Sequence, residues 1–500
     1  MTEIGYLCNR CSAIKDDMYA TMQSSISLAG IRDDLPGFHG ETEFMLKEFI
    51  NSLHSFPNCR EGQLVAFERF LQKAHHLGIL NTYELFSRFI RVSTEMCLDR
   101  FNNELYTQFS SSNDIQTKRN CIWGSYVILL ALLVKYSQGD ENRLYLLNKV
   151  LGIVAGVLLR NHDVMHTKVE QVPYHNFFIG LFLQLTAAEP ILENINLEVV
   201  TTFCNLLKIM SPVNVPGFVH QWMNILANVS FLARIYRSDE KIWRMYAQLL
   251  GDLFKFLSPF LRTGCLDKLT IKLHKSTQAL LLVLLRDVPE FLCDHQHTFC
   301  DAMSPYCIEM RNILLTTFPR NVPFTNPYTP GLKVDMLPEI SRPPCRNISY
   351  TNIIQSAHFK KDLDSYVRSG CPTTFPSKLI RDLKSNDLDG PFSYNIPLIN
   401  ALVLYVGTQA IDDINSKGLT PSMSTIKDSK QTKFCEDLLS QLDTMSCYLF
   451  ITAICNQLTY PNSHTHYFSL LLQYLFNSAV KEDIHTQITR QVLQQPFFYH

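Results

Sequence analysis

The sequence predicts an all-α protein in which antiparallel helix pairs form a solenoid, with one extended strap between two helical blocks. Three observations predict this fold class. Apolar residues recur at the i, i+3, i+4, i+7 spacing of amphipathic helices along most of the 500 residues. Glycine supplies only 19 residues, about half of its usual share, so tight β-turns are scarce. Seven of the 23 prolines crowd into residues 319–344, where they disfavour helix.

The first helical block is predicted over residues 31–318, after a flexible tail at residues 1–30. No fixed repeat period is visible, so the helix pairs are predicted to be degenerate, HEAT-like repeats. Two helices of this block show a clear apolar face. The residues of these faces are Leu64, Phe67, Leu71 and Ala74 in one helix, and Ile242, Tyr246, Leu249, Leu250, Leu253, Leu257 and Phe260 in the other.

Two helix starts are predicted from their capping residues. Asn81, followed three positions later by Glu84, resembles a capping box. Ser304 precedes Pro305, which predicts a serine N-cap and a proline at the first helical position.

The strap is predicted over residues 319–349 and the second helical block over residues 350–500. We expect the strap to lie extended across a helical block, because its apolar residues need a surface. These residues are Val322, Phe324, Tyr328, Leu332, Val334, Met336 and Leu337. The second block contains an apolar helical face made of Leu398, Leu402, Val406, Ala410 and Ile414.

The bulk composition indicates a cytosolic protein outside membranes. The formal net charge of −1 argues against strong electrostatic binding of nucleic acid. The 15 cysteines are scattered, and Cys204, Cys447 and Cys455 fall inside apolar helical patterns, as buried reduced thiols do. The N-terminus has no apolar core of signal-peptide length. We therefore expect a cytoplasmic location, with P-bodies and a minor nuclear pool as further sites.

The two strongest apolar runs are shorter than a membrane span. They cover Tyr126–Val134 and Val150–Leu159, whereas a spanning helix needs about 20 residues. The second run contains Gly152 and Gly156 at the spacing that lets two helices pack closely.

Three clusters contain metal-ligating residue types, but the pattern of each favours a structural role. Cys8 and Cys11 form half of a zinc site, and no second half follows. His162, Asp163 and His166 close a long apolar helix, where polar capping residues are expected. The stretch Cys293–Cys300 also contains His295 and His297, which diverge by about 200° on a helix. We expect no metal and no other cofactor at these positions.

The stretch YPNSHTHYFS, residues 460–469, combines two histidines with polar neighbours. Asn462 or Ser463 is predicted to be the N-cap of a helix whose apolar face contains Phe468, Leu471, Leu472 and Leu475. His464 and His466 then lie on different faces of the first turn, so they cannot bind one metal within that helix. Nucleophile-elbow, P-loop, dinucleotide and zinc-protease motifs are absent from the sequence. We therefore predict a protein that is not an enzyme and has no small-molecule substrate.

Several long stretches resemble the C-terminal region of the Not-one family, the scaffold subunits of the CCR–NOT mRNA deadenylase complex. They include LLNKVLGIVAGVLLRNHDV (146–164), MYAQLLGDLFKFLSPFLR (245–262), TPGLKVDMLPEI (329–340), FKKDLDSY (359–366), LINALVLYVGTQAI (398–411), TPSMSTI (420–426) and YPNSHTHYFS itself. The resemblance covers about residues 31–495. It implies a non-catalytic HEAT-like scaffold that docks the Not-two and Not-three subunits.

The resemblance also implies a role in mRNA deadenylation, translational repression and mRNA decay. Partners would include RNA-binding translational repressors, with mRNA bound indirectly. The docking or family-diagnostic residues that it implies are Pro319, Arg320, Asp335, Met336, Phe359, Lys360, Lys361, Asp362, Tyr366, Tyr460, Pro461, Asn462, Ser463, His464, His466, Tyr467 and Phe468. We expect His464, His466 and Tyr467 either to connect adjacent helices or to face a partner.

Both ends of the chain depart from the family pattern. We expect a short, stand-alone relative without docking sites for the nucleases, which either supports or competes with the full-length scaffold. The final helical pair is expected to be missing, which would expose apolar surface around residues 470–476.

Two alternative functions are retained. Direct RNA binding would use basic residues such as Lys360, Lys361, Arg311 and Arg320, although surface cations are more often simply solvated. A metal-dependent hydrolase would use the histidine clusters.

Overall fold

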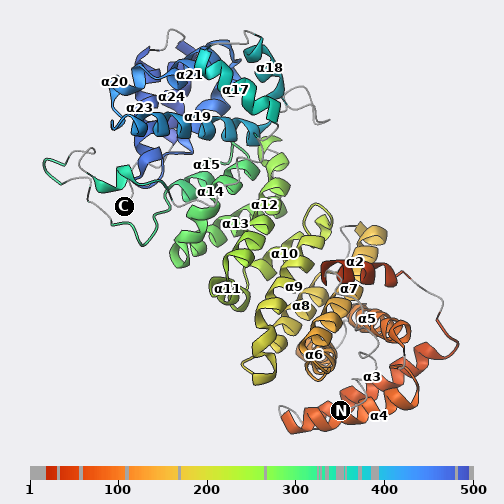
Figure 1. The fold of residues 1–500 in the computed structure, drawn as a ribbon. Helices are drawn as coiled ribbons and strands as arrows, with labels where there is room; N and C mark the ends of the chain where they lie inside the picture. The colour runs from red at the N-terminus through yellow and green to blue at the C-terminus, as the bar shows by residue number, and fades with distance from the viewer. Residues whose placement is uncertain are drawn as a thin grey trace. The chain divides into compact units, whose positions relative to one another are not determined.

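The computed structural model describes residues 18–30, 34–55, 60–80, 82–106, 112–166, 170–263, 267–323, 326, 329–332, 337–344, 354, 357–369, 374–384, 394–478 and 482–494. All regular elements among these residues are helices, and one isolated bridge joins Lys384 to Tyr394 (Figure 1). The all-α prediction is therefore confirmed for the described part of the chain.

The chain divides into two compact units, residues 1–252 and 253–500. The predicted boundaries, after residues 30, 318 and 349, differ from this division. The helices of the first unit are α2 (Met18–Leu28), α3 (Phe38–His54), α4 (Arg60–His76), α5 (Tyr83–Tyr106), α6 (Ser112–Lys135), α7 (Asp140–Met165), α8 (Val172–Leu185), η2 (Pro190–Ile195), α9 (Asn196–Ile209), η3 (Pro216–Phe218), α10 (Val219–Leu226) and α11 (Val229–Tyr236). Helix α12 (Glu240–Thr263) continues into the second unit.

The second unit contains the remaining helices. They are α13 (Lys268–Asp287), α14 (Pro289–Ala302), α15 (Ile308–Leu315), η5 (Pro338–Ser341), α17 (Ala357–Ser369), α18 (Phe375–Asp382), α19 (Ile396–Ser416), α20 (Met423–Lys427), α21 (Lys430–Gln441), α22 (Thr444–Cys455), α23 (Ser463–Ser478) and α24 (Glu482–Gln494).

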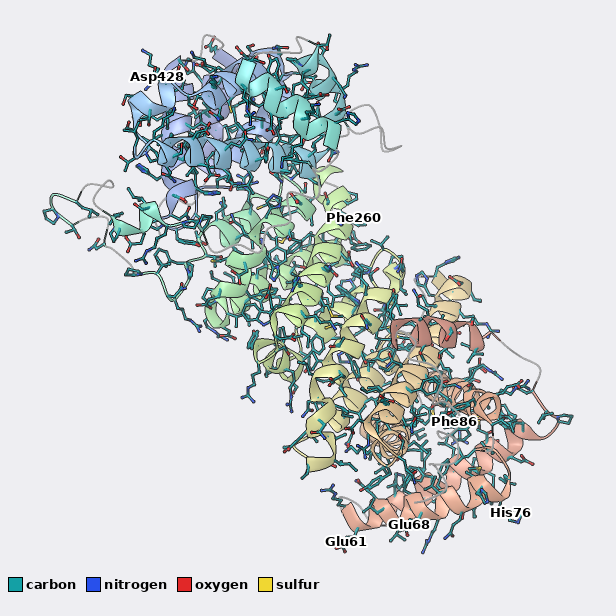
Figure 2. All side chains as sticks on the ribbon, in the orientation of Figure 1. Glu61, Glu68, His76, Phe86, Phe260 and Asp428 are labelled. Atoms are coloured by element: carbon teal, nitrogen blue, oxygen red, sulfur yellow. The ribbon has the colours of Figure 1, made fainter. Side chains whose placement is uncertain are left out.

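The predicted apolar faces form the cores of their helices. In α12, Ile242 to Leu257 of the predicted set are fully buried, and Phe260 is half-buried. All five predicted residues of α19 are buried. In α4 the buried side is centred on Phe67 and Phe70, while Glu61, Glu68 and His76 are exposed on the other side (Figure 2). Periodicity thus predicted the helices correctly and the buried face of α4 only approximately.

Helix α7 is the apolar centre of the first unit. By length and composition it could cross a membrane, and it is the one helix among the described residues that passes this test. However, 78% of its apolar window is buried within the protein. The run Val150–Leu159 is the middle of this helix, so its apolar residues are used in packing.

The flexible-tail prediction is wrong for residues 18–30, because α2 packs against α7. A Cβ atom at Gly152 would lie 2.7 Å from Ser25 Cβ, and one at Gly156 would lie 2.7 Å from Ala29 Cβ. The two helices therefore approach at the small-residue spacing that the sequence indicated. The missing side chains at Gly152 and Gly156 provide the surface that holds α2.

The two predicted helix starts need correction. Helix α15 begins at Ile308, because Ser304 and Cys307 form a turn in which the Cys307 N–H donates to the Ser304 carbonyl at 2.9 Å. Asn81 lies outside the described residues. The Thr82 hydroxyl accepts from the Leu85 N–H at 3.2 Å, so Thr82 caps the start of α5.

The strap is irregular in its described part, apart from the short η5. Val322, Leu332 and Leu337 are half-buried, whereas Phe324, Tyr328, Val334 and Met336 lie outside the described residues.

The surface around residues 470–476 is largely covered, contrary to expectation. Leu471, Leu472 and Leu475 are buried, because α23 packs against α19 and α24. Phe476 remains 42% exposed and contacts the His485 ring at a centroid distance of 4.9 Å.

Candidate partner-docking site

The structure places the predicted docking residues in two groups within the second unit. The first group surrounds the start of α23, where the beginning of the strap and Arg342 also lie. The second group lies on α17. Asp335 and Met336 are outside the described residues.

Asn462 organises the start of α23, as predicted. Its Oδ1 accepts from the Thr465 N–H at 3.0 Å, which makes Asn462 the N-cap of the helix. Its Nδ2 donates to the Tyr460 carbonyl at 2.6 Å and to the Thr459 hydroxyl at 3.3 Å. Asn462 is only 1% exposed, so these bonds replace all of its contacts with water.

The two histidines and the tyrosine that follow Asn462 are buried. His466 is buried, and its Nε2 lies 3.1 Å from the Pro421 carbonyl just before α20, a distance suited to N–H donation. The His464 ring is also buried and packs on Phe468, with ring centroids 6.2 Å apart. Tyr467 is fully buried, and this burial raises the pKa of its phenol well above the usual range. His466 thus links α23 to the segment before α20, whereas His464 packs within its own helix. Direct contact of these residues with a partner stays a prediction.

The start of the strap and its later residue Arg342 lie beside the same turn. Phe318, immediately before the strap, packs on the Tyr460 ring at 6.0 Å between centroids. Near the other end, the Arg342 carbonyl accepts from the Ser463 N–H at 2.9 Å. That amide belongs to the first turn of α23 and has no partner within the helix, so the strap satisfies it.

The first two strap residues have structural roles of their own. Pro319 is buried. Arg320 is exposed, and its Nη2 donates to the Arg286 and Asp287 carbonyls at 2.8 and 2.9 Å. These are orphan carbonyls at the C-terminal end of α13, where an arginine is favourable.

Helix α17 presents the part of the predicted site that a partner can reach. Lys360 and Lys361 are exposed, and Phe359 and Tyr366 are half-buried. Lys360 Nζ lies 5.7 Å from the centre of the Tyr405 ring, and Asp362 pairs with Lys378 at 3.7 Å. We name Phe359, Lys360, Lys361, Asp362 and Tyr366 the α17 surface.

Residues that the sequence reasoning missed hold the α17 surface in place. Tyr366 packs on Phe375 and Phe434, at 5.5 and 6.1 Å between ring centroids. The Tyr405 hydroxyl and Gln409 Nε2 both donate to Asp364 Oδ1 at 2.8 Å. Tyr405 and Gln409 are four residues apart on α19, a spacing that shows them on one face, but their acceptor on α17 was not visible in the sequence.

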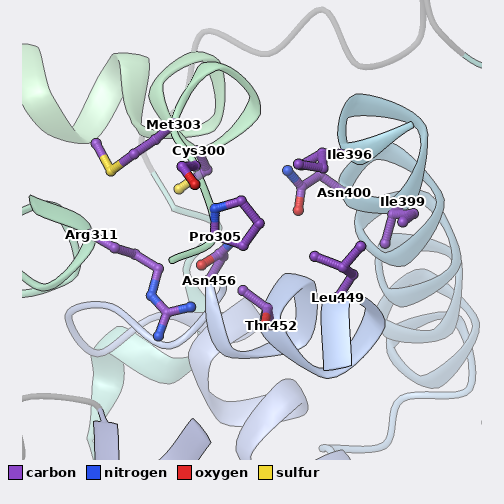
Figure 3. A pocket seen from close by; sticks show the side chains of 11 residues that line it. Cys300, Met303, Pro305, Arg311, Ile396, Ile399, Asn400, Leu449, Thr452 and Asn456 are labelled. Atoms are coloured by element: carbon purple, nitrogen blue, oxygen red, sulfur yellow. The ribbon is translucent and has the colours of Figure 1, made fainter. Parts of the chain in front are cut away.

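The RNA-binding alternative loses one of its basic residues. Arg311 is 4% exposed and lines a cavity of about 20 Å³ together with Asn400, Thr452 and Asn456 (Figure 3). Its Nη2 donates to Gln491 Oε1 at 3.1 Å. A guanidinium placed in this way cannot reach a phosphate backbone.

The metal candidates are engaged in other contacts. The Gly217 N–H donates to His162 Nε2 at 3.3 Å, and His297 Nδ1 pairs with Asp301 at 3.0 Å. His295 packs on Phe291, with ring centroids 5.1 Å apart. Cys8 and Cys11 lie outside the described residues. Within the described ranges, no group of three or more His, Cys, Asp or Glu side chains could hold a metal ion.

The buried thiols are poor nucleophiles. Burial raises the pKa of Cys204 and of Cys455 to about 12, so both are protonated at neutral pH. Cys447 is buried in the same way. The three therefore behave as the small hydrophobic side chains that the sequence predicted.

Replacing Asn462 tests the cap. Asn462→Ala should lower the free energy of unfolding by about 2 kcal/mol, because the cap and a buried hydrogen-bond network are lost together. Urea denaturation of the whole chain measures this loss. Asn415→Ala, at an exposed position of α19, should change stability by less than about 0.5 kcal/mol. Equal stabilities of the two variants would contradict the role of Asn462.

Comparison with known proteins agrees with the fold and the sequence stretches described above. Residues 182–499 match the family described as "CCR4-Not complex component, Not1". The chain is 31% identical over 473 residues to the CCR4-NOT transcription complex subunit let-711 of Caenorhabditis elegans, covering 91% of this chain and 18% of that protein. It is 26% identical over 498 residues to the general negative regulator of transcription subunit 1 of Schizosaccharomyces pombe, covering 96% and 23%. The chain thus spans about a fifth of the length of these curated relatives.

Two solved structures share the fold. The NOT1 superfamily homology domain from Chaetomium thermophilum matches with a TM-score of 0.81 at 19% identity, covering 93% of this chain and 91% of that chain. A Not1 C-terminal domain in complex with Not4 matches with a TM-score of 0.73 at 22% identity, covering 92% and 93%. Together with the family match, which extends over more than half of the residues, these findings show that the chain belongs to the Not1 family.

Proposed function

We propose that this chain is a non-catalytic docking module of the CCR4-Not complex that binds the Not-two/Not-three heterodimer. The family match over residues 182–499 carries this proposal. Through such binding the module supports mRNA deadenylation, translational repression and mRNA decay in the cytoplasm. RNA-binding repressors bring the mRNA, so the module itself needs no catalytic site.

The α17 surface suits protein docking. It combines half-buried aromatic side chains, Phe359 and Tyr366, with exposed lysines at the edge. Interfaces between proteins commonly have this arrangement, with aromatic anchors inside a polar rim. Packing on Phe375 and Phe434 holds the Tyr366 ring in place, so binding would require little reordering.

Charge reversal on α17 tests the docking surface. Lys360→Glu combined with Lys361→Glu should weaken binding of the purified Not-two/Not-three heterodimer about tenfold, because rim charges govern complementarity. Isothermal titration calorimetry measures the dissociation constant. Lys427→Glu with Lys433→Glu, at exposed positions of α20 and α21, is the matched control and should bind within about twofold of the unmodified protein.

The outcomes test the proposed docking function and the location of the interface separately. A well-folded unmodified protein that does not bind the heterodimer contradicts the proposed function. Binding that is equal in both double variants leaves the function intact and places the interface away from the α17 surface.

Not4 is a second candidate partner. The solved Not1 C-terminal domain that shares this fold is described as a complex with Not4, which supports the candidate. Titrating Not4 in the same calorimetric assay decides it. Binding of Not4 but not of the heterodimer would identify Not4 as the partner of this module.

A further inference from the structure

The solvent-facing side of α13 is strongly basic. Positions 268, 272, 275, 279, 282 and 286 repeat at three- and four-residue steps, so their side chains share one face of the helix. Ile271 borders this face and is 38% exposed, and Leu282 within it is 51% exposed. We name this set the α13 face, and all its members are exposed: Lys268, Ile271, Lys272, Lys275, Ala279, Leu282 and Arg286.

The three lysines of the α13 face are not neutralised within the described part of the chain. No ion pair involves Lys268, Lys272 or Lys275 there, while Arg286 pairs with the adjacent Asp287 at 2.6 Å. Asp287 is the only acidic residue between 268 and 287. A cluster of three free cations stands out in a chain whose formal net charge is −1.

The acidic groups nearest in sequence and packing have other roles. Asp267 caps α13 by accepting from the Thr270 N–H at 2.8 Å. Glu309 on α15 is bonded by the Gln278 amide. Neither carboxylate pairs with a lysine of the face, so the positive potential of the α13 face stays available to a partner.

Helix stability does not explain these lysines. Lys268 and Lys272 lie in the first turns of α13, where the helix dipole already disfavours cations. Lys268, Lys272 and Lys275 also repel one another along one stripe. Their electrostatic cost to the helix would be offset when negative charge approaches from outside.

We propose that the α13 face binds an acidic segment of a protein partner that also carries aliphatic side chains. This inference rests on the proposed docking function and names the chemistry of a partner segment. Ile271 and Leu282 would pack against aliphatic side chains of that segment, while the lysines pair with its carboxylates. The face has a length of about 27 Å, enough for a partner helix of similar length.

The composition of the face favours a peptide over nucleic acid. Sites for single-stranded nucleic acid combine basic residues with aromatic side chains on which bases stack. The α13 face has no aromatic member, and its exposed aliphatic residues would meet charged phosphates. A peptide satisfies both the charged and the apolar members.

A binding assay with a designed probe tests the α13 face directly. The probe is a fluorescein-labelled 18-residue peptide of glutamate and leucine, arranged so that both line one side of a helix. Fluorescence anisotropy with the full chain should show binding that weakens as salt increases. The variant Lys268→Glu, Lys272→Glu, Lys275→Glu should bind at least about tenfold more weakly.

Matched controls give each outcome a meaning. The variant Lys417→Glu, Lys427→Glu, Lys433→Glu changes the net charge equally at exposed positions of the same unit and should retain binding. A probe with serine in place of leucine should bind more weakly, which tests the aliphatic contact. Equal binding by the two triple variants overturns the proposal. So does tighter binding of an 18-nucleotide polyuridine RNA that the α13 variant loses.

The heterodimer separates this inference from the proposed function. Failure of the unmodified chain to bind Not-two/Not-three contradicts the proposed function alone, because the peptide probe still decides whether the α13 face binds acidic segments. Heterodimer binding that survives the α13 triple variant, with the probe lost, assigns the face to a different partner protein.

Discussion

Gly407→Ala should destabilise the second unit by about 3 kcal/mol, even though alanine is the better helix former. Gly407 lies in α19 against the ring of Phe468 on α23. A Cβ atom there would lie 2.9 Å from both Cε1 and Cε2 of Phe468 and closer still to Cζ. Phe468 is 1% exposed, so the ring has no open space into which it can move. The substitution therefore forces α19 and α23 apart, and urea denaturation measures the loss.

A glycine without such a neighbour provides the control. Gly124 in α6 is exposed, and no atom lies within 4 Å of a Cβ built on it. Gly124→Ala should therefore stabilise the protein by about 1 kcal/mol through helix propensity alone. Adding Phe468→Leu to Gly407→Ala should recover part of the loss, because a smaller side chain leaves room for the new methyl group. A gain of stability on Gly407→Ala alone would contradict the close contact.

Gln491→Leu should destabilise the second unit by a similar amount, about 3 kcal/mol, by leaving a buried cation without its acceptor. Arg311 of α15 donates from Nη2 to Gln491 Oε1 of α24 at 3.1 Å, and both side chains are almost fully buried. Arg311 Nε and Nη1 have no partner in the described part of the chain, so Gln491 supplies the only acceptor of the guanidinium among those residues.

Two further variants at this site should both be more stable than Gln491→Leu. Gln491→Glu supplies a carboxylate to the guanidinium and should keep or raise the stability at neutral pH. Arg311→Met combined with Gln491→Leu removes both polar groups and should restore most of the loss, since an apolar pair can replace a buried polar one. A double variant as unstable as Gln491→Leu would show that the cost comes from packing and not from the unpaired charge.

The candidate site could be predicted from the sequence only where its causes are local. Asn462 caps α23 because a cap depends on the residues within one helical turn. His464 and His466 point to different surroundings because their separation on a helix is set by its geometry. The contact of His464 with Phe468 is also local, because the two residues are four apart on α23. The contact of His466 with the Pro421 carbonyl depends on a distant segment that the pattern does not connect.

Errors in the sequence-based predictions arose where packing outweighed local signals. Residues 18–28 have a weak amphipathic pattern, yet α2 forms because Gly152 and Gly156 leave space for its small residues. Ser304 and Pro305 have the chemistry of a helix start, yet a turn occupies this position and α15 begins at Ile308. Arg311 was predicted as a surface cation, but its helix buries it at a cavity wall.

The sequence alone determined the helical class, the apolar faces of α12 and α19, the cap at Asn462 and the resemblance to the Not1 family. Each of these depends on the order and spacing of residues within single segments. The tertiary structure decided which faces meet. It placed the beginning of the strap and Arg342 beside the start of α23, packed α2 against α7, buried Arg311 and left the α13 face in solvent. Contacts between distant segments depend on shape and volume in three dimensions, which periodicity along the chain does not encode.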